Sequence, residues 1–321
     1  MGKVIHLDQA AIERAAQLPA SVRAGLTDPT ARISVLTVTR DGSRRLECYA
    51  VEGESERLAV VTSNGKSETV VSFPLDPKAV EALLNETLGL DQPLAEPGIE
   101  RELDEAALWA LAAMADAHRQ LELESLLARR PERRIAVDED SIYLRVLDGA
   151  SLPDPRWLSG MLTQLLGPGD VSEARLQRGL AALERAGLIG KDSTDRWTPQ
   201  PGFTAAFAHL EVPLSGARVS INWRSKNGID YVSLGLLRTL AAVWRTEPRG
   251  RAEAMTGVAL RSMTADAVRS GIHNAIVQAL RTEPQPVSKS NTADARRFCP
   301  QCGGAVAVTD RFCGQCGAHL T

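Results

Sequence analysis

Residues 31–50 read ARISVLTVTRDGSRRLECYA. From Ile33 to Val38 apolar side chains alternate with polar ones, and the pair Asp41-Gly42 follows shortly afterwards. Alternation of this kind indicates a half-buried strand, and Asp-Gly is a common two-residue turn between antiparallel strands. The stretch therefore predicts a β-hairpin with one face turned toward a core.

The neighbouring segments predict a second hairpin between two helices. The runs RLAVVTS and SETVVSF flank Asn64-Gly65, a pair whose residues both accept the positive φ of a tight turn. Asp76 and Pro77 precede VEALLNETL, so Asp76 is expected to cap a helix whose first turn contains the proline. Upstream, Asp8 before QAAIERAAQL predicts another helix, which ends at Pro19.

The middle of the chain predicts more helix. Residues 103–130 contain neither proline nor glycine and repeat apolar side chains at steps of three and four, which predicts one long helix or two abutting ones. A short hairpin is expected next, with RRIAV and SIYLRVL as strands around a turn at residues 138–140.

Residues 154–199 predict two helices and a hairpin. A helix in PRWLSGMLTQLL is followed by a break at residues 167–170, a second helix in VSEARLQRGLAALERAGLI and a turn in KDSTDR. This order resembles a winged-helix domain. The resemblance implies that Val171–Ala186 stands in the place of the recognition helix and Lys191–Arg196 in the place of the wing.

The last third repeats the pattern of the first. Residues 201–282 predict a helix, several strands and a terminal helix, in the order already found over residues 8–88. The fold class that follows is α+β, with antiparallel hairpins and packed helices. The expected divisions are an N-terminal α+β domain (1–100), a helical, winged-helix-like segment (101–200), a second α+β segment (201–282), a flexible linker (283–296) and a zinc ribbon (297–321).

Four of the five cysteines lie close together near the C-terminus. Cys299 and Cys302 form one Cys-x-x-Cys pair, and Cys313 and Cys316 form another after ten intervening residues. Four thiolates in this spacing are typical of a closed, tetrahedral, structural Zn²⁺ site without a position for an activated water. The competing interpretation is a pair of disulfides, which the absence of an apparent secretion signal disfavours.

These residues resemble the short zinc-ribbon domains at the ends of many bacterial proteins, whose pattern is two Phe-Cys-x-x-Cys-Gly knuckles. The knuckles here run from Phe298 to Gly303 and from Phe312 to Gly317. The resemblance implies one structural Zn²⁺ and a protein-interaction module or, less often, a nucleic-acid-binding one. His319 follows the fourth cysteine, and with four thiolates present it is expected to be an exposed terminal residue.

The composition excludes several classes of protein. The 321 residues include 37 basic and 40 acidic side chains, for a formal net charge of -3, which argues against a basic nucleic-acid-coating protein. No run is long and apolar enough for a membrane span, and the first residues, MGKVIHLDQA, lack the apolar core of a secretion signal. We therefore expect a cytoplasmic protein.

Local charge does not favour DNA binding by the winged-helix-like segment, because phosphate contacts require an excess of bases. The bases between residues 170 and 197 are Arg175, Arg178, Arg185, Lys191 and Arg196, and the acids are Asp170, Glu173, Glu184, Asp192 and Asp195. This balance is more typical of a helix that packs against protein, and an internal structural helical hairpin with no partner is equally consistent with it.

Catalytic motifs are not apparent. Gly65-Lys66-Ser67 lacks the first glycine of a phosphate-binding loop, since that position is Val60. Gly167-Pro168-Gly169 has no preceding strand and no third glycine at Ser172. The five histidines are scattered, and Cys48 is expected to be a small buried apolar residue.

The function expected from the sequence is that of a non-catalytic adaptor or scaffold. It would bind a partner protein on its large N-terminal body and use the ribbon as an accessory contact. The alternative is a DNA-binding transcriptional regulator that uses the winged-helix-like segment and the ribbon. The candidate interface anchors are Trp109, Trp157, Trp197, Trp223 and Trp244, although most tryptophans in a chain of this size fill cores.

Overall fold

The structure is a computed structural model of the chain. It describes residues 20–27, 29–51, 54–63, 69–95, 97–129, 135–169, 172–225, 228–249, 257–281, 296–298 and 305–307.

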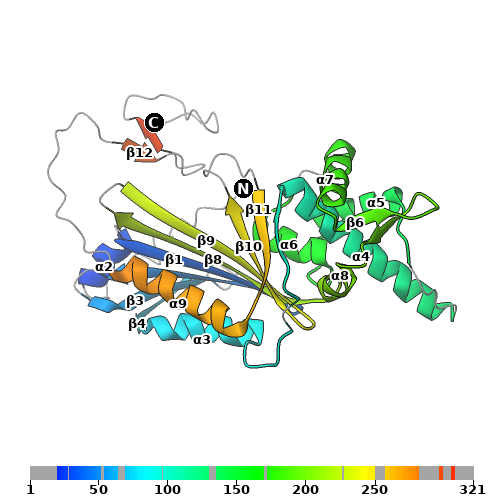
Figure 1. The fold of residues 1–321 in the computed structure, drawn as a ribbon. Helices are drawn as coiled ribbons and strands as arrows, with labels where there is room; N and C mark the ends of the chain where they lie inside the picture. Colours follow the sequence, from blue (N-terminus) through cyan, green and yellow to red (C-terminus); the bar gives the residue numbers. More distant parts are fainter. Residues whose placement is uncertain are drawn as a thin grey trace.

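A nine-stranded antiparallel sheet forms the centre of the fold (Figure 1). Its strands, in order across the sheet, are β4 (Thr69–Leu75), β3 (Glu54–Ser63), β2 (Gly42–Val51), β1 (Ala31–Thr39), β8 (Pro213–Ser225), β9 (Gly228–Thr239), β10 (Val243–Arg249), β11 (Gly257–Met263) and β5 (Glu100–Leu103). The mixture of helices with an antiparallel sheet confirms the α+β class.

The sheet consists of two meanders joined along one seam. β1 to β4 form the first meander, β8 to β11 form the second, and β1 pairs antiparallel with β8. At the seam Ile33 lies opposite Ile221 and Val35 opposite Val219. Each meander leads into a helix, α3 (Pro77–Leu88) or α9 (Ala265–Arg281). The repeated pattern of the two chain segments is therefore present as matching topology within one sheet.

Helices α3 and α9 lie side by side against one face of the sheet (Figure 1). The Asp76 side chain caps α3 by accepting a hydrogen bond from the Lys78 amide at 2.8 Å, as expected, and Gly89 ends the helix with φ of 56°. The core beneath them combines residues from both meanders: Ile33, Val35, Cys48, Val80, Leu84, Val219, Ile221 and Ile272. Cys48 is fully buried there, which confirms its predicted role.

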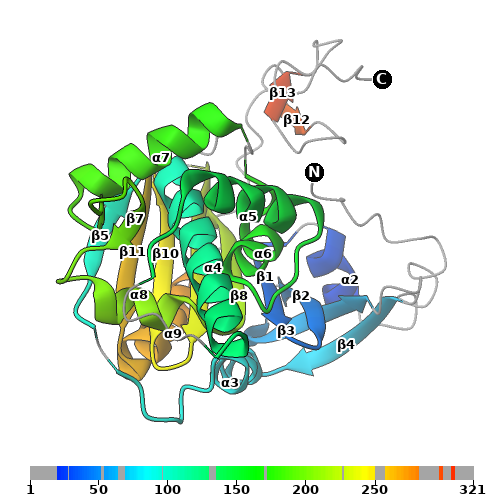
Figure 2. The same cartoon turned by 90° about the vertical axis from the view of Figure 1, so that its right-hand side faces the viewer.

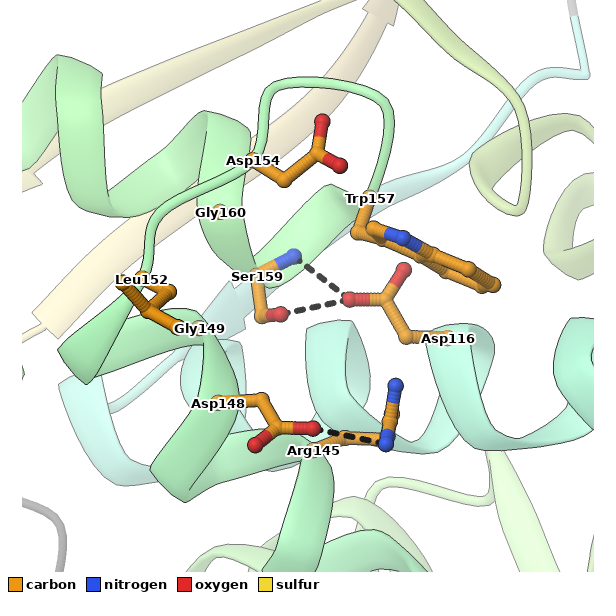
Figure 3. A pocket seen from close by; sticks show the side chains of 9 residues that line it. All are labelled: Asp116, Arg145, Asp148, Gly149, Leu152, Asp154, Trp157, Ser159 and Gly160. Atoms are coloured by element: carbon orange, nitrogen blue, oxygen red, sulfur yellow. Dashed lines mark hydrogen bonds and ion pairs between the residues drawn. The ribbon is translucent and has the colours of Figure 1, made fainter.

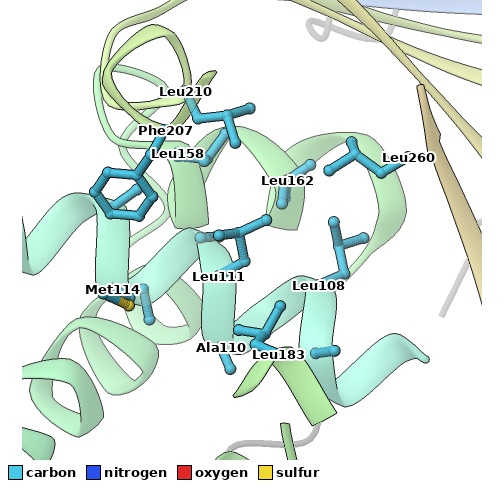
Figure 4. Packing of buried hydrophobic residues seen from close by; sticks show 14 of the residues in the cluster. Leu108, Ala110, Leu111, Met114, Leu158, Leu162, Leu183, Phe207, Leu210 and Leu260 are labelled. Atoms are coloured by element: carbon cyan, nitrogen blue, oxygen red, sulfur yellow. The ribbon is translucent and has the colours of Figure 1, made fainter. Parts of the chain in front are cut away.

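A helical body covers part of the opposite face (Figure 2). It contains α4 (Glu105–Leu127), α5 (Glu139–Ser151), α6 (Leu158–Leu166), α7 (Glu173–Arg185) and α8 (Thr204–Leu210). α4 is the single long helix of the two alternatives that the sequence allowed, and its N-cap is Asp104. Leucines of α4 and α6 meet Leu260 of β11 in the second core (Figure 4).

The prediction of a hairpin around residues 138–140 is wrong. Residues 139–151 form α5, and the Asp138 side chain accepts a hydrogen bond from the Ser141 amide at 2.8 Å, which makes it the N-cap. Glu139 and Asp140 stand in the first turn, where acidic side chains interact favourably with the helix dipole. The acidic run that was interpreted as a turn is therefore a helix start.

The helix and hairpin that resemble a winged helix are present as elements. α7 leads into β6 (Ile189–Lys191), which pairs with β7 (Trp197–Pro199), and Val137 makes a single bridge to Trp197. α7 packs closely on α4, since a Cβ at Gly179 would lie 2.3 Å from the Ala106 carbonyl oxygen. The identification of this segment as a winged helix stays a prediction.

Several predicted features lie outside the described residues. They are the helix expected before Pro19, the Asn64-Gly65 turn, the four ribbon cysteines and all of the linker 283–296 except Arg296, which begins a strand. β12 (Arg296–Phe298) and β13 (Ala305–Ala307) are described and pair antiparallel, with Phe298 opposite Ala305. Among the helices that the structure describes, none combines the length and apolar character needed to cross a lipid bilayer.

Candidate functional site

The helical body covers only part of one sheet face, and the uncovered part of that face carries polar side chains. Side chains of β2, β1, β8 and β9 point from this part of the sheet, and cross-strand pairing places Glu47, Ser34, Ser220 and Ser233 in one continuous row. We call it the polar sheet face, and it consists of Arg32, Ser34, Arg45, Glu47, Tyr49, Arg218, Ser220, Asn222, Tyr231 and Ser233.

Glu47 organises the first half of the polar sheet face. The residue is only 4% exposed, and its carboxylate accepts hydrogen bonds from Arg45 Nε at 2.6 Å, Ser34 Oγ at 2.8 Å and Arg32 Nε at 2.9 Å. The two arginine side chains are 44% and 41% exposed. A buried carboxylate is thus fully engaged and holds two guanidinium groups at the surface in fixed positions.

Arg218 extends this positive charge across the seam. It lies opposite Leu36 on β1 and is half-buried, and it has no hydrogen bond or ion pair with any side chain that the structure describes. Burial and the neighbouring charge of Arg45 lower the pKa of Arg218. Three arginines therefore face one carboxylate, and this part of the surface is left with positive charge that an anionic group would neutralise.

Helices stand at two borders of the polar sheet face. On one side α2 (Ala20–Thr27) packs its Val22 and Leu26 on Ala59 of β3. At the other border α6 lies directly on β8, because a Cβ at Gly216 would lie 2.5 Å from Leu165 Cδ1. The next outward-facing residue along β8 is Arg218, so the change from covered to polar surface takes place within two residues.

A second buried carboxylate, Asp116, lies within the helical body (Figure 3). It accepts hydrogen bonds from the Leu158 amide at 2.7 Å, the Ser159 amide at 2.8 Å and Ser159 Oγ at 2.6 Å. Burial raises the pKa of Asp116 to about 6, although these hydrogen bonds partly oppose the shift. The carboxylate caps α6 and fastens it to α4, which is a structural role.

The cavity beside Asp116 is too small to be a substrate pocket. It is lined by residues that include Arg145, Trp157 and Ser159, and its volume is about 30 Å³ (Figure 3). That volume holds about two water molecules, whereas sites for small molecules occupy about 300–1,000 Å³.

The tryptophans proposed as interface anchors mostly fill cores. Trp244, Trp197 and Trp223 are 0%, 5% and 6% exposed, which excludes them as surface anchors. Trp109 and Trp157 are half-buried, and the Arg119 guanidinium lies 4.9 Å from the centre of the Trp157 ring. The metal ligands predicted from the sequence, Cys299, Cys302, Cys313 and Cys316, lie outside the described residues.

Sequence reasoning missed the polar sheet face. Its members come from strands more than 150 residues apart, for example Glu47 and Ser220, so their meeting depends on the seam between β1 and β8. One local signal was available. A glutamate in a strand is rarely buried without a cationic partner, and Glu47 stands between the apolar residues Leu46 and Cys48.

No family model matches the chain, and no curated protein matches it in sequence. Among solved structures, similarity is found to the Mycobacterium tuberculosis type VII secretion system chaperone EspG5, solved in complex with the PE25-PPE41 dimer. The match covers 85% of this chain and 85% of that chain, at 9% sequence identity and a TM-score of 0.39.

Proposed function

We propose that the protein is a non-catalytic adaptor that binds an acidic segment of a partner protein on the polar sheet face. The observation that carries the proposal is Arg218, a half-buried arginine that shares the charge of Glu47 with Arg32 and Arg45 and has no hydrogen bond or ion pair with a described side chain. A carboxylate of the partner would supply the missing charge and form charge-assisted hydrogen bonds with the guanidinium group.

The residue types of this surface support a protein partner. Arginine and tyrosine are enriched where protein interfaces have their strongest contacts, and Tyr231 is 57% exposed at the end of the same face. Because Glu47 already fixes Arg32 and Arg45, little side-chain entropy would be lost when they bind.

The DNA-binding alternative has no comparable observation in its favour. In the winged-helix-like segment Arg175 pairs with Glu105 at 2.6 Å, and Lys191 pairs with Asp195 at 2.9 Å. These pairs occupy two of the five bases that the segment would need for phosphate contacts.

The C-terminal ribbon forms the accessory part of the proposal. We infer that Cys299, Cys302, Cys313 and Cys316 bind one structural Zn²⁺, as four thiolates in this spacing do. Metal analysis of the full chain should then find a zinc ion bound with thiolate ligands, and Cys302→Ser should release it. The same content of thiolate-bound metal in both proteins would refute the ribbon.

Site-specific photo-crosslinking tests the adaptor proposal. A benzoylphenylalanine at position 231, on the polar sheet face, should crosslink the full chain to a protein in a lysate of its native cells. Arg218→Glu should abolish that crosslink, because it reverses the charge that attracts the partner. Raising the salt concentration should weaken it for the same reason.

Two controls make the crosslinking experiment decisive. Arg178→Glu changes an exposed arginine on α7 and should leave the crosslink intact, and the photoreactive group at Gln177 should capture nothing specific. A crosslink at position 231 that survives Arg218→Glu would contradict the proposal. Tight, salt-dependent DNA binding that Arg178→Glu weakens would favour the transcriptional regulator instead.

A further inference from the structure

Three side chains that can bind metals meet where α4 passes the end of α8. His118 and Glu122 are four residues apart on α4, so they share one face of the helix. Glu211 is the residue that follows α8. One ligand atom from each of the three side chains lies within 4.8 Å of the others.

The inner two members of this group are a half-buried histidine and a buried glutamate, and the atoms with which they face each other have no hydrogen bond among the described residues. The Glu211 side chain is 9% exposed and that of His118 is 17% exposed. Their Oε1 and Nδ1 atoms are in contact, yet among the described residues neither atom has a hydrogen-bond partner of acceptable geometry. A buried carboxylate oxygen in this condition is costly unless a cation occupies the space that it faces.

The surroundings hold the His118 ring and the backbone at Glu211 in place. The His118 ring stands edge-on to Phe207, with ring centroids 5.4 Å apart and an interplanar angle of 86°. Arg119 Nη1 donates a hydrogen bond to the Glu211 backbone carbonyl at 3.1 Å, which fixes the chain at that residue. These contacts orient the imidazole ring and the backbone at Glu211 before any ion binds.

A simple ion pair explains the arrangement less well than a metal ion does. A protonated His118 would donate its Nδ1 proton to Glu211 Oε1, but the structure contains no hydrogen bond between these two atoms, although they are in ion-pair contact. Glu122 adds a second carboxylate near the same imidazole. One imidazolium leaves these two negative charges only partly compensated, whereas a divalent cation neutralises both.

We propose that His118, Glu122 and Glu211 bind one Zn²⁺ ion. Zinc takes imidazole nitrogen and carboxylate oxygen at about 2.0–2.2 Å, which places tetrahedral ligands about 3.3 Å apart. Glu122 is exposed and free to close the remaining separation by a change of rotamer. Three protein ligands leave the fourth position to water, and the ion joins α4 to the segment that leads from α8 into β8.

Cobalt binding to the full chain tests the site separately from the ribbon. In a Cys302→Ser background we expect one Co²⁺ per chain, with visible d–d bands but without thiolate-to-cobalt charge transfer. His118→Ala and Glu122→Gln should each weaken Co²⁺ binding about 100-fold or more, because each removes a ligand. Glu124→Gln changes an exposed carboxylate two residues further along α4 and should leave the affinity unchanged.

Each outcome of this experiment is decisive. Glu122 is exposed, so its substitution tests the site even if His118→Ala destabilises the fold. The proposal is overturned if the Cys302→Ser chain binds no Co²⁺ saturably, or if Glu122→Gln binds it as tightly as Glu124→Gln does. The thiolate charge-transfer band, which the Cys302→Ser substitution should remove, reports only on the ribbon. Its loss does not change the one Co²⁺ per chain expected at His118, Glu122 and Glu211.

Discussion

The covered end and the open end of one sheet face differ in what holds them together. At the covered end Val38, Leu237, Trp244 and Leu260 pack beneath the helical body. At the open end β1 and β9, together with β2 and β8, present the polar sheet face, where side chains such as Arg218 stand in place of leucine. The two meanders have the same strand order. The outward-facing side chains therefore determine which part of the face packs against helices and which part stays open to a partner.

The two buried carboxylates, Asp116 and Glu47, also differ in the groups that donate hydrogen bonds to them. At the covered end Asp116 is bound by two backbone amides and a hydroxyl, all of which are neutral donors. At the open end Glu47 is bound by two guanidinium groups and a hydroxyl. The first carboxylate stabilises the packing of two helices, whereas the second positions cations at the surface.

The largest effect is expected from truncating the aromatic side chain at the covered end. Trp244 is fully buried and donates from Nε1 to Thr239 Oγ1 at 3.2 Å. Trp244→Ala should lower the free energy of unfolding by about 3–5 kcal/mol in urea denaturation. Tyr231→Ala, at the exposed end of the same face, should change it by about 0.5 kcal/mol or less. Equal losses would mean that the two ends are packed alike.

The pH dependence of stability should reveal the raised pKa of the buried Asp116 carboxyl group. Its pKa is raised from 3.8 to about 6, so the contribution of the protonated form is fully present below about pH 4 and is lost as the pH rises through 6. Between pH 4 and 7 the wild-type protein should lose roughly 2–3 kcal/mol relative to Asp116→Asn. Unfolding curves that run parallel in the two proteins across this range would show that Asp116 keeps an ordinary pKa.

The close contact between α4 and α7 predicts an unusual response to alanine. Replacing a helical glycine by alanine normally stabilises a helix by about 1 kcal/mol. Gly179→Ala should instead destabilise the protein by about 1–3 kcal/mol, because its Cβ would meet the Ala106 carbonyl. Gly202→Ala has nothing within 4 Å of its Cβ and serves as the control. A rise in the melting temperature of Gly179→Ala would contradict the packing described.

The smallest effect is expected at the open end, from neutralising Glu47. Glu47→Gln removes the charge that Arg32 and Arg45 share, but both arginines are more than one third exposed and keep contact with water. We expect a loss of about 1 kcal/mol at low salt that shrinks at 1 M salt. A loss that does not depend on salt would show that shape rather than charge holds this cluster.

Local signals predicted most of the elements correctly. The hairpin of β1 and β2, the Asp76 cap and the long α4 follow from residues adjacent in sequence. The turn of that hairpin lies one residue earlier than predicted, at Arg40 and Asp41, because Gly42 already pairs with Thr39. The error at α5 came from giving more weight to the apolar alternation in SIYLRVL than to the cap at Asp138. β5 was missed because a four-residue edge strand, EREL, carries no alternation of its own.

The candidate sites were beyond the reach of local signals. Arg218 joins Glu47 only because β1 pairs with β8, and Glu211 reaches His118 only because α8 packs beside α4. Neither pair has a spacing in the sequence that indicates the contact. The four cysteines are the opposite case, because ligands that lie close together in the sequence predict a metal site without knowledge of the fold.

The pairing of β1 with β8 also implies a delay during biosynthesis, because the two strands are far apart in the sequence. β1 ends at Thr39 and its partner strand begins at Pro213, so a ribosome adding about 5–20 residues per second completes β8 roughly 10–40 s after β1 emerges. During that interval the first meander would expose the unpaired backbone groups of β1, which can recruit strands of other chains. Until β8 has been synthesised, the nascent chain folds correctly only if aggregation is slower than synthesis or if a chaperone covers the exposed edge of β1.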